Sequence, residues 1–391
     1  MRESVIVSAV RTPTGKFLGA LKTFTAPQLG ALVVAEAVRR AGIDADIVDE
    51  CIMGNVVPAG EGQNPARQAA LRGGLPEHVA ALTINKVCGS GLKAVMLADQ
   101  GIRVGDIDVA VAGGMESMSN CPYLLPRVRE GLRMGNGEVV DSMINDGLWC
   151  AFENQHMGNA GEVVAECYRV SRALQDEYAA QSHQRAARAT ADGAFKDEIL
   201  PITIPSKKGD TIIDRDEPIR ADTTVAGLGA LKPAFRKDGT VTAGNAPGVN
   251  DGASCVIVTS EEFAKRRGLE ILATILAQAY VADDFAYLAR TPARAGHLAL
   301  EKAGKSIGDV ERVEINEAFS SVALNSTRLL GADEEIVNVN GGAVALGHPI
   351  GASGGRIVGT MVHELRRNGG GLGLAAICSG GGQGDALLLQ V

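Results

Sequence analysis

The sequence predicts an α/β protein made of two similar halves, each a mixed sheet with helices on its faces. Apolar segments typical of strands alternate with segments of helical periodicity, which favours a mostly parallel sheet covered by helices. The 391 residues suffice for two or three domains with large cores. Glycine accounts for 49 of them, well above the usual ~7 %, so many tight turns or close backbone approaches are expected.

A weak internal repeat supports the two halves. Four blocks in the first part of the chain align, in the same order, with four blocks in the second part at offsets of 262 to 265 residues. The aligned pairs are 41–42 with 303–304, 48–55 with 310–317, 88–91 with 351–354, and 109–112 with 374–377. Few residues are identical within a block, but the constant order argues against chance. Each half is therefore predicted to run strand, helix, strand, helix, strand, helix, strand.

The two halves are predicted to differ by one long insertion. The second half passes almost directly from its glycine-rich turn into a last strand at 386–389, whereas the comparable strand at 253–259 follows only after a detour. That detour contains an amphipathic helix near 172–192, and such insertions often carry binding residues. The predicted domains are a first half (1–118, completed by about 250–269), an inserted loop domain (119–249) and a second half (270–391).

Composition and charge argue against several classes of protein. The net charge of −8 disfavours nucleic-acid binding over the surface, although one anionic ligand in a local basic cleft stays compatible with it. No apolar run reaches the ~18 residues of a membrane span. The first residues lack the pattern of a secretory signal, and the last three are not a peroxisomal address. We therefore expect a cytoplasmic protein that binds neither nucleic acid nor membranes.

The seven cysteines fit neither a disulfide framework nor a zinc site. They are odd in number, lie at least 17 residues apart and form no CxxC or CxxH pair. Two interpretations stay open: one or two of them are reactive thiols, or most are small buried apolar side chains.

Cys88 and His348 are the first candidate catalytic residues. Cys88 follows the apolar segment 82–87 and precedes a helical pattern, so its thiol lies at a strand-to-helix turn where the helix dipole favours thiolate. A buried, inert cysteine would give the same pattern. His348 lies just before the turn that the repeat makes equivalent, and a neutral imidazole beside a thiol can act as its base. Alternatively, His348 caps a helix.

Cys378 and Asn316 each end a predicted strand. Cys378 enters the glycine-rich turn SGGGQG, whose backbone N–H groups are free to face a ligand, and by itself this pattern would equally suit a phosphate loop. Asn316 follows the strand at 312–315, where a side-chain amide can donate to a developing oxyanion or hold a water that does. A helix N-cap explains Asn316 equally well.

Taken together, the segments NKVCGSG, NEAF, GHPIGASG and CSGGG resemble the thiolase family, and the similarity extends over essentially the whole chain. The resemblance implies the thiolase fold: two pseudo-symmetric halves, each a mixed five-stranded sheet, layered α/β/α/β/α, plus an inserted loop domain. It also implies a homo-oligomer, either a dimer or a tetramer, with residues 123–136 as an assembly loop. No metal and no organic cofactor are implied, because CoA and acyl-CoA are substrates.

The resemblance implies a role for each candidate residue. Cys88 would be the nucleophile, His348 the base that activates it, and Cys378 the second acid and base. Asn316 would hold a water in one oxyanion hole, and the backbone N–H groups of Cys88 and Gly380 would form another.

The same resemblance places the CoA contacts mainly in the insertion. Arg220 matches a position near the nucleotide phosphates, with a solvated surface arginine as the alternative. The residues that would line the pantetheine and acyl end are Leu148, His156, Met157, Ala318 and Phe319, and for several of these ordinary core packing is an equally good interpretation. The chain departs from the family pattern at Pro247, where a serine is usual, and at 288–292, so part of the CoA mapping is open.

The leading hypothesis is therefore an acetyl-CoA C-acyltransferase that interconverts two acetyl-CoA with acetoacetyl-CoA plus CoA through an acyl-cysteine. One alternative is a degradative 3-ketoacyl-CoA thiolase for longer chains. Another is a non-catalytic thiolase-like CoA-binding partner subunit, against which the presence of all four catalytic side chains counts.

Overall fold

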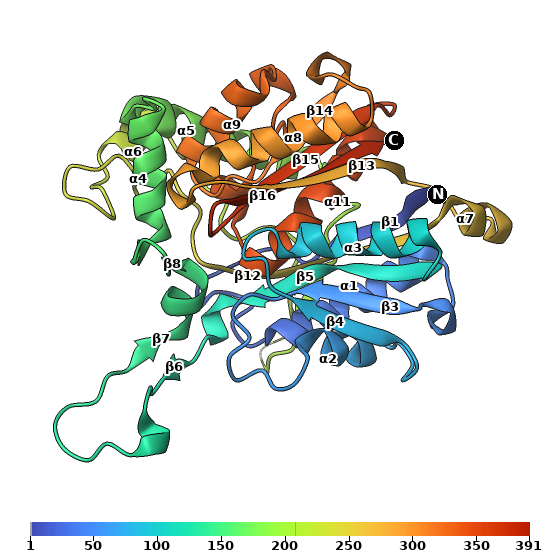
Figure 1. Cartoon of the computed structure of the whole chain (residues 1–391), viewed down its shortest axis with the longest axis horizontal. Coiled ribbons are helices and arrows are strands. Elements are labelled where there is room, and N and C mark those ends of the chain that lie inside the picture. The colour runs from blue at the N-terminus through green and yellow to red at the C-terminus, as the bar shows by residue number, and fades with distance from the viewer. Residues whose placement is uncertain (1, 208) are drawn as a thin grey trace.

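The computed structural model describes residues 2–207 and 209–391, and its centre is a large mixed sheet with helices on both faces (Figure 1). The first half contains β1 (Ser4–Arg11), β2 (Gly15–Lys16), α1 (Ala26–Ala41), β3 (Glu50–Gly54), α2 (Pro65–Arg72), β4 (Ala80–Ile84), α3 (Ser90–Val104), β5 (Val109–Ser117), β12 (Asn250–Ser260) and α7 (Glu261–Arg267). The second half contains β13 (Ala273–Ala282), α8 (Thr291–Lys302), β14 (Arg312–Ile315), α9 (Ser320–Leu330), α10 (Ala343–Leu346), α11 (Ser353–Arg367), β15 (Leu372–Ser379) and β16 (Gln383–Gln390).

In its described residues, the insertion forms short strands and three α-helices beside these halves. Its elements are β6 (Tyr123–Leu124), β7 (Val140–Asp141), β8 (Trp149–Cys150), β9 (Gln155–His156), α4 (Met157–Cys167), α5 (Arg172–Ala191), β10 (Ile202–Ile204), β11 (Thr211–Ile213) and α6 (Val225–Gly229). The helix predicted near 172–192 is α5, whose first turn is capped because the Ser171 side chain accepts from the backbone N–H of Leu174. Helices α4 and α5 pack against α9 of the second half (Figure 1).

The sheet has two parts related by approximate symmetry. Its order is β14-β15-β16-β13-β1-β12-β5-β3-β4, and the central strands β1 and β13 pair antiparallel through Ser4–Ile6. Among the residues that the structure describes, the first part has the expected five strands, and the short β2 is added to them by pairing with β12. In the described part of the second half four strands form, and the place equivalent to β4 holds only an isolated bridge between Val313 and Val337. The fifth strand expected there is thus reduced to one bridging residue.

The internal repeat is confirmed with one correction to its alignment. Strands β3 and β14 begin at Glu50 and Arg312, and helices α3 and α11 begin at Ser90 and Ser353, so the offsets of 262 and 263 hold. Strands β5 and β15 occupy equivalent places at an offset of 263, because β3 pairs Glu50 with Ala110 while β14 pairs Arg312 with Gly373. The sequence alignment of 109–112 with 374–377 was therefore wrong by two residues, because the apolar residues of the two strands do not mark equivalent places in the sheet.

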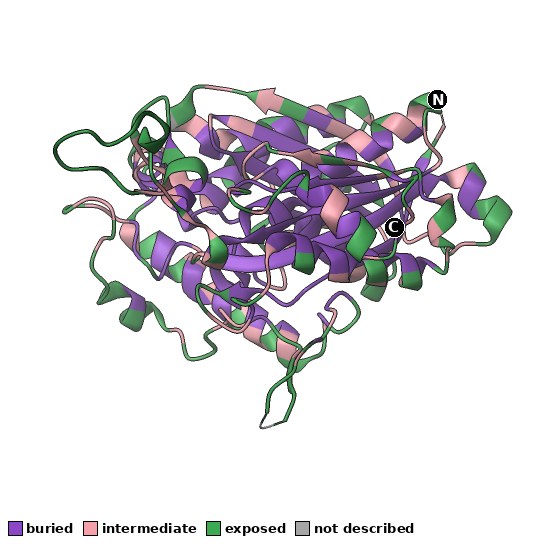
Figure 2. Cartoon of the chain, turned by 90° about the horizontal axis from the view of Figure 1, so that it is seen from below, coloured by how far each residue is buried: buried purple, intermediate pink, exposed green. Residues whose placement is uncertain are grey.

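Three buried apolar clusters fill the spaces between five layers. Helices α1 and α2 cover the outer face of the first part of the sheet, over a cluster that includes Leu29 and Val111. Helices α3 and α11 pack on each other between the two parts, around Met96 and Ile357. Helices α8 and α9 cover the far face, and Leu374 belongs to the cluster beneath α8. The predicted α/β/α/β/α layering is confirmed, and Figure 2 shows the buried residues along the strands.

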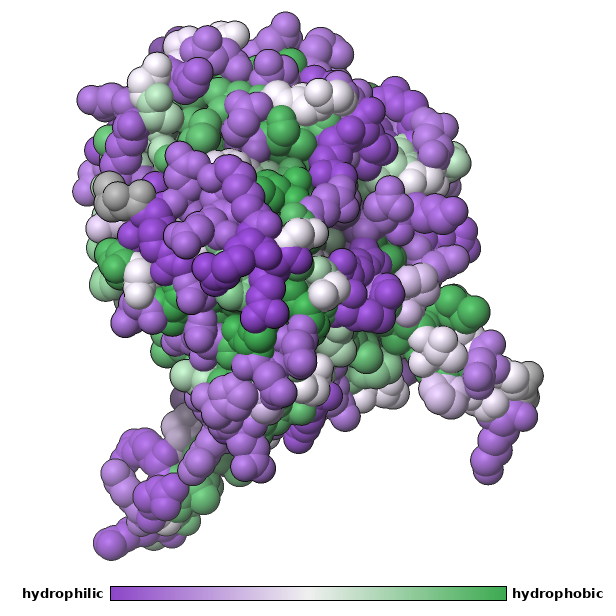
Figure 3. Space-filling model, turned by 90° about the vertical axis from the view of Figure 1, so that its right-hand side faces the viewer, coloured by the Kyte–Doolittle hydropathy of each residue, from purple (hydrophilic) through white to green (hydrophobic). Residues whose placement is uncertain are grey.

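The surface carries one projecting arm that is rich in apolar side chains. On the face drawn in Figure 3, hydrophilic residues predominate and hydrophobic ones show between them. The arm contains β6 and β7 and extends away from the rest of the molecule (Figure 1). Its exposed apolar side chains are Tyr123, Leu125, Val128, Leu132, Met134 and Val139. Within the described residues, no helix is both long enough and apolar enough to span a membrane.

Candidate active site

A cavity of ≈ 330 Å³ gathers residues from both halves and from the insertion. Ten of the twelve predicted site residues line it: Cys88, His348, Cys378, Gly380, Leu148, His156, Met157, Pro247, Ala318 and Phe319. The two that do not line it are Asn316 and Arg220. The symmetry of the halves explains why Cys88 and His348 lie in one cavity. Helices α3 and α11 begin shortly after these two residues, and they pack on each other between the two parts of the sheet.

Cys88 lies in the turn between β4 and α3, and its thiol is half-buried. Burial raises the pKa of this thiol to about 12, although the backbone N–H groups of Gly380 and of Cys88 itself lower it. The expectation that the helix start favours thiolate is therefore wrong for the free enzyme, because loss of hydration outweighs the helix dipole. A neutral thiol in this place needs a base within reach.

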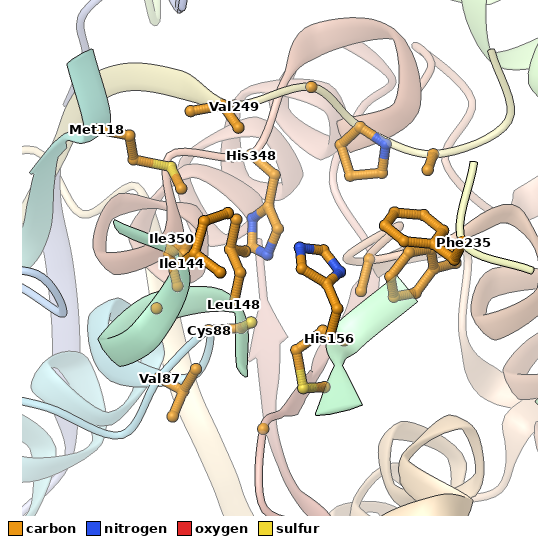
Figure 4. Close-up of a pocket in the computed structure, with 18 of the residues that line it drawn as sticks. Val87, Cys88, Met118, Ile144, Leu148, His156, Phe235, Val249, His348 and Ile350 are labelled. Carbon is orange, nitrogen blue, oxygen red and sulfur yellow. The ribbon is translucent and has the colours of Figure 1, made fainter. Parts of the chain in front are cut away.

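His348 offers such a base. Its Nδ1 atom lies 2.6 Å from the Oγ atom of Ser353, and that hydroxyl donates to the carbonyl oxygen of Pro349 at 2.9 Å. Because the serine proton is already used, Nδ1 must carry the imidazole proton and Nε2 must carry the lone pair. Nε2 is buried and has no hydrogen-bond partner among the described residues. The ring and the Cys88 sulfur face the same space (Figure 4).

The environment also keeps His348 neutral. Burial, together with the positive charge of Arg356, lowers the pKa of His348 to about 3. The imidazole is therefore a free base throughout the physiological range. The alternative in which His348 caps a helix is not what the structure shows, since its ring contacts a hydroxyl rather than the free backbone N–H groups of α11.

Cys378 supplies a second thiol from the opposite half. It lies near the end of β15, where it pairs with Gly384, and its side chain is fully buried against Phe319 and Leu288. Burial and then the nearby Cys88 raise its pKa well above the usual value. The interaction between the two thiols indicates that both sulfurs share one small apolar space.

Asn316 lies immediately after β14 and is buried behind the cavity. Its side-chain oxygen accepts from the Arg356 guanidinium at 3.5 Å, at the limit of a hydrogen bond. Its Nδ2 group is buried without a partner among the described residues. A buried N–H donor without a partner is costly, so this amide is suited to a ligand or to an ordered water.

His156 presents the opposite tautomer on the insertion side. Its Nδ1 atom accepts from the backbone N–H of Gly158 at 3.0 Å, so in the neutral ring Nε2 carries the proton. The ring stacks on Phe235 with centroids 4.8 Å apart, and burial lowers its pKa. Figure 4 shows the two imidazoles approaching the same space from different elements. The cavity thus holds one acceptor and one donor nitrogen.

Arg220 lies at the surface, outside this cavity. Its backbone N–H donates to Nδ1 of His183 at 3.2 Å, and its guanidinium lies 3.2 Å from Nε2 of the same ring. Burial and the neighbouring Arg220 lower the pKa of His183 to about 4. At the other departure from the family pattern, Leu288 lines the cavity, whereas Arg290 pairs with Asp283.

Some residues of the site carry no recognisable signal in the sequence. Phe235 and Ile144 line the cavity but lie in parts of the insertion that carry no motif. Ser353, which fixes the tautomer of His348, does have a signal: the repeat makes it equivalent to Ser90, which also bonds the turn before its own helix. That signal does not identify the role of the serine, because one sequence does not show which histidine nitrogen it reaches.

The fold and the paired thiols define an acyl-transfer protein of the thiolase class, and the chain belongs to the thiolase family. The family models "Thiolase, N-terminal domain" and "Thiolase, C-terminal domain" match residues 4–262 and 269–391. Together, the two matches cover the chain apart from a short segment at its start and a short segment between them.

Similar proteins cover the chain from end to end. Acetyl-CoA acetyltransferase of Pseudomonas aeruginosa is 53% identical over 390 residues, which are 100% of this chain and 99% of that protein. The Paracoccus denitrificans protein of the same name is 50% identical, with 100% of each chain covered. The crystal structure of the Bacillus anthracis acetyl-CoA acetyltransferase superposes with a TM-score of 0.97 at 43% identity and covers 100% of this chain and 99% of that chain.

Proposed function

We propose that the protein is an acetyl-CoA C-acetyltransferase that joins two acetyl-CoA molecules into acetoacetyl-CoA and free CoA, and that also runs the reverse cleavage. The observation that carries this proposal is the single cavity in which Cys88, Cys378 and the free Nε2 of His348 meet. Two thiols and one neutral imidazole supply a nucleophile, a base for it and a second acid and base. The similar acetyl-CoA acetyltransferases support the same activity.

The first half-reaction transfers an acetyl group to Cys88. Nε2 of His348 takes the thiol proton as the sulfur attacks the thioester carbonyl of acetyl-CoA. The carbonyl oxygen gains negative charge, and the backbone N–H groups of Cys88 and Gly380, which reach the thiol region, stabilise it. The C–S bond to CoA then breaks, the CoA sulfur takes the proton from His348, and acetyl-Cys88 remains.

The second half-reaction forms the carbon–carbon bond. The Cys378 thiol first gives its proton to Nε2 of His348, and the resulting thiolate takes a proton from the methyl group of a second acetyl-CoA. The protonated Nε2 of His348 and a water bound to Nδ2 of Asn316 then donate to the enolate oxygen. The enolate carbon attacks the acetyl carbon of Cys88. Collapse of the tetrahedral intermediate releases acetoacetyl-CoA, and the Cys88 thiolate takes the proton held by His348. Cys378 keeps the proton from the methyl group, so both thiols end the cycle protonated.

The apolar surroundings of the two thiols fit this chemistry. Burial raises the pKa of both thiols, so both are protonated in the resting enzyme. Once substrate excludes water, a fixed N–H donor stabilises developing negative charge more strongly than it would in water. The proposed reaction needs no metal ion and no organic cofactor.

The substrates bind, on this proposal, with the pantetheine arm along the insertion. Leu148, Met157, Pro247 and Phe319 present apolar surface to such an arm, and His156 offers a donor. Arg220 would meet the anionic nucleotide outside the cavity. Pro247 gives no hydroxyl, so the contact that a serine would make there is replaced by apolar packing.

We propose further that the protein acts as a homo-oligomer in the cytoplasm. The arm that contains β6 and β7 exposes six apolar side chains, and Met134 is 98% exposed. Exposed apolar side chains gathered on one projecting segment favour contact with a second copy. Sedimentation velocity of the whole chain, and of a variant with Leu132 and Met134 changed to Ser, tests the assembly, and cell fractionation tests the location.

Trapping of the acyl-enzyme tests the proposed activity. Labelled acetyl-CoA, mixed with the enzyme without free CoA and quenched in acid within the first turnover, is expected to leave one acetyl group on Cys88, and Cys88→Ser is expected to abolish it. Absence of label in the wild type, with CoA still bound, would favour the CoA-binding subunit. Turnover of 3-ketoacyl-CoA substrates of increasing length separates the short-chain enzyme from the degradative one, because preference for long chains contradicts the proposal.

A further inference from the structure

Cys88 follows a residue with a strained backbone. Val87 has φ of +48°, a left-handed conformation that β-branched residues rarely adopt and that persists only where neighbouring contacts hold it. Two local hydrogen bonds help: the Lys86 N–H donates to Ser90 Oγ at 2.8 Å, and that hydroxyl donates to the Val87 carbonyl at 2.6 Å. Both bonds lie within the turn itself, so they do not fix the turn relative to the second half.

Asp385, in β16 of the second half, contacts this turn on both sides of Cys88. Its Oδ1 atom pairs with Nζ of Lys86 at 2.5 Å. Its Oδ2 atom faces Gly89, where an added Cβ would lie 2.6 Å from it and 2.5 Å from Oγ of Ser379. The Asp385 side chain is fully buried and that of Lys86 is 16% exposed. The carboxylate thus pairs with the residue two before the nucleophile and packs closely against the residue after it, although Oδ2 itself has no hydrogen-bond partner in the described part of the chain.

The same carboxylate is placed by the strand pair that carries the second thiol. Cys378 pairs with Gly384, the residue next to Asp385, and Asp385 itself pairs with Ile377. The Lys86 ammonium also lies over the Tyr280 ring of β13, 5.6 Å from its centroid. Both of these contacts of the Lys86 ammonium are therefore with the second half, whereas the backbone of Lys86 leads directly into Val87 and Cys88 of the first half.

We propose that the Lys86–Asp385 ion pair is a positioning device that holds the strained turn, and with it the Cys88 sulfur, at its working place against His348 and Cys378. This inference rests on the proposed function, because it assigns the pair a role in acylation of Cys88. Neither residue touches the reacting atoms. Loss of the pair lets the turn relax toward an unstrained backbone, which moves the sulfur away from the base without removing any part of the CoA site.

The experiment measures acetylation of Cys88 in single turnovers with labelled acetyl-CoA. Asp385→Asn and Lys86→Met are each expected to slow acetylation at saturating substrate about tenfold or more, with little change in the concentration that gives half the maximal rate, since small misplacements of reacting groups cost rate rather than binding. The double variant is expected to lose no more than one single variant, because both changes remove the same contact. Lys86→Arg is expected to restore most of the rate.

Asp99→Asn is the matched control. Asp99 lies on α3 and is fully buried, like Asp385, and it pairs with Arg103, whose side chain is 23% exposed and also reaches the second half through the Ile275 carbonyl. This pair lies at the opposite end of the helix from Cys88. Melting temperatures measure how far each variant destabilises the fold. Only the variants at 86 and 385 are expected to slow acetylation by more than their loss of stability explains.

Two outcomes overturn the inference. One is acetylation by Asp385→Asn at the wild-type rate, and the other is an equal loss in Asp99→Asn at the same drop in melting temperature. If wild-type Cys88 acquires no label, the proposed function itself is overturned. That outcome is seen in the wild type alone, before any variant is compared.

Discussion

The Nδ1–H group of His348 donates a hydrogen bond to Oγ of Ser353 across 2.6 Å, and the serine hydroxyl in turn donates to the Pro349 carbonyl oxygen. The chain of donors ends at the carbonyl, so it runs in one direction only. The basic nitrogen of the imidazole is thereby turned toward the Cys88 thiol. Burial makes that thiol a weak acid, so the direction of this chain decides whether the thiol meets a lone pair or an N–H group.

Ser353→Ala is expected to slow acetylation of Cys88 by about tenfold to a hundredfold, because the imidazole then spends much of its time in the wrong tautomer or orientation. Binding of acetyl-CoA is expected to change little, since the serine does not line the cavity. Single-turnover acetylation and CoA binding by calorimetry measure the two effects. Ser326→Ala, a buried serine whose hydroxyl bonds the Ala289 carbonyl, is the control. Equal acetylation rates in the two variants contradict this role.

Cys378→Ala is expected to separate the two half-reactions. Acetyl-Cys88 is expected to form at a rate within about threefold of the wild type, because His348 and the backbone donors are intact, while condensation falls by at least about 10²-fold for want of the base. Acid-quenched labelling follows the first step and acetoacetyl-CoA formation follows the second. If acetylation falls as far as condensation, the two thiols do not divide the work in this way.

Much of the fold and the site could be predicted from the sequence because both depend on short-range patterns. Cys88, Asn316 and Cys378 each follow or end an apolar segment, and residues at such ends gather at one edge of a sheet. The repeat then relates the turn after Cys88 to the turn after His348 from the order of the residues alone. Only the alignment of the strand at 109–112 with its equivalent in the second half was wrong, by two residues.

Other features depend on contacts that one sequence does not contain. The pKa of Cys88 is set by how completely the cavity walls exclude water, and those walls include Phe235 and Leu148 of the insertion. Lys86 belongs to the NKVCGSG segment, but nothing in the sequence indicates that its partner is Asp385, 299 residues further along the chain. The single bridge at Val337, in place of a strand, likewise follows from packing rather than from the local pattern.

The rate of acetylation is expected to be nearly independent of pH between about 5.5 and 9. The reactive form contains neutral His348, whose pKa lies at about 3, and a protonated Cys88 thiol, whose pKa lies at about 12. An ordinary histidine base would instead cause a tenfold loss per unit below about pH 6.5. Single-turnover labelling across this range distinguishes the two, and a break near 6.5 contradicts the neutral, buried base.

The low pKa of His348 also makes the stability of the fold depend on pH in a definite direction. Because the pKa of His348 falls from 6.5 to about 3 on folding, the unfolded chain binds more protons between these values. Its contribution to the free energy of unfolding is therefore complete above pH 6.5 and is lost as the pH falls toward 3. The wild-type melting temperature is expected to fall more steeply between pH 6 and pH 4 than that of His348→Asn. Identical slopes contradict this expectation.

Arg220→Ala tests whether the CoA nucleotide reaches the surface outside the cavity. Loss of one charged hydrogen bond to phosphate is expected to raise KM for acetyl-CoA about tenfold with kcat unchanged. A truncated substrate, acetyl-pantetheine, lacks the nucleotide, so its KM is expected to be the same in both enzymes. Arg215→Ala, at an exposed arginine of the same segment, is the matched control. If the variant weakens both substrates equally, Arg220 acts through His183 and the shape of the insertion rather than through phosphate.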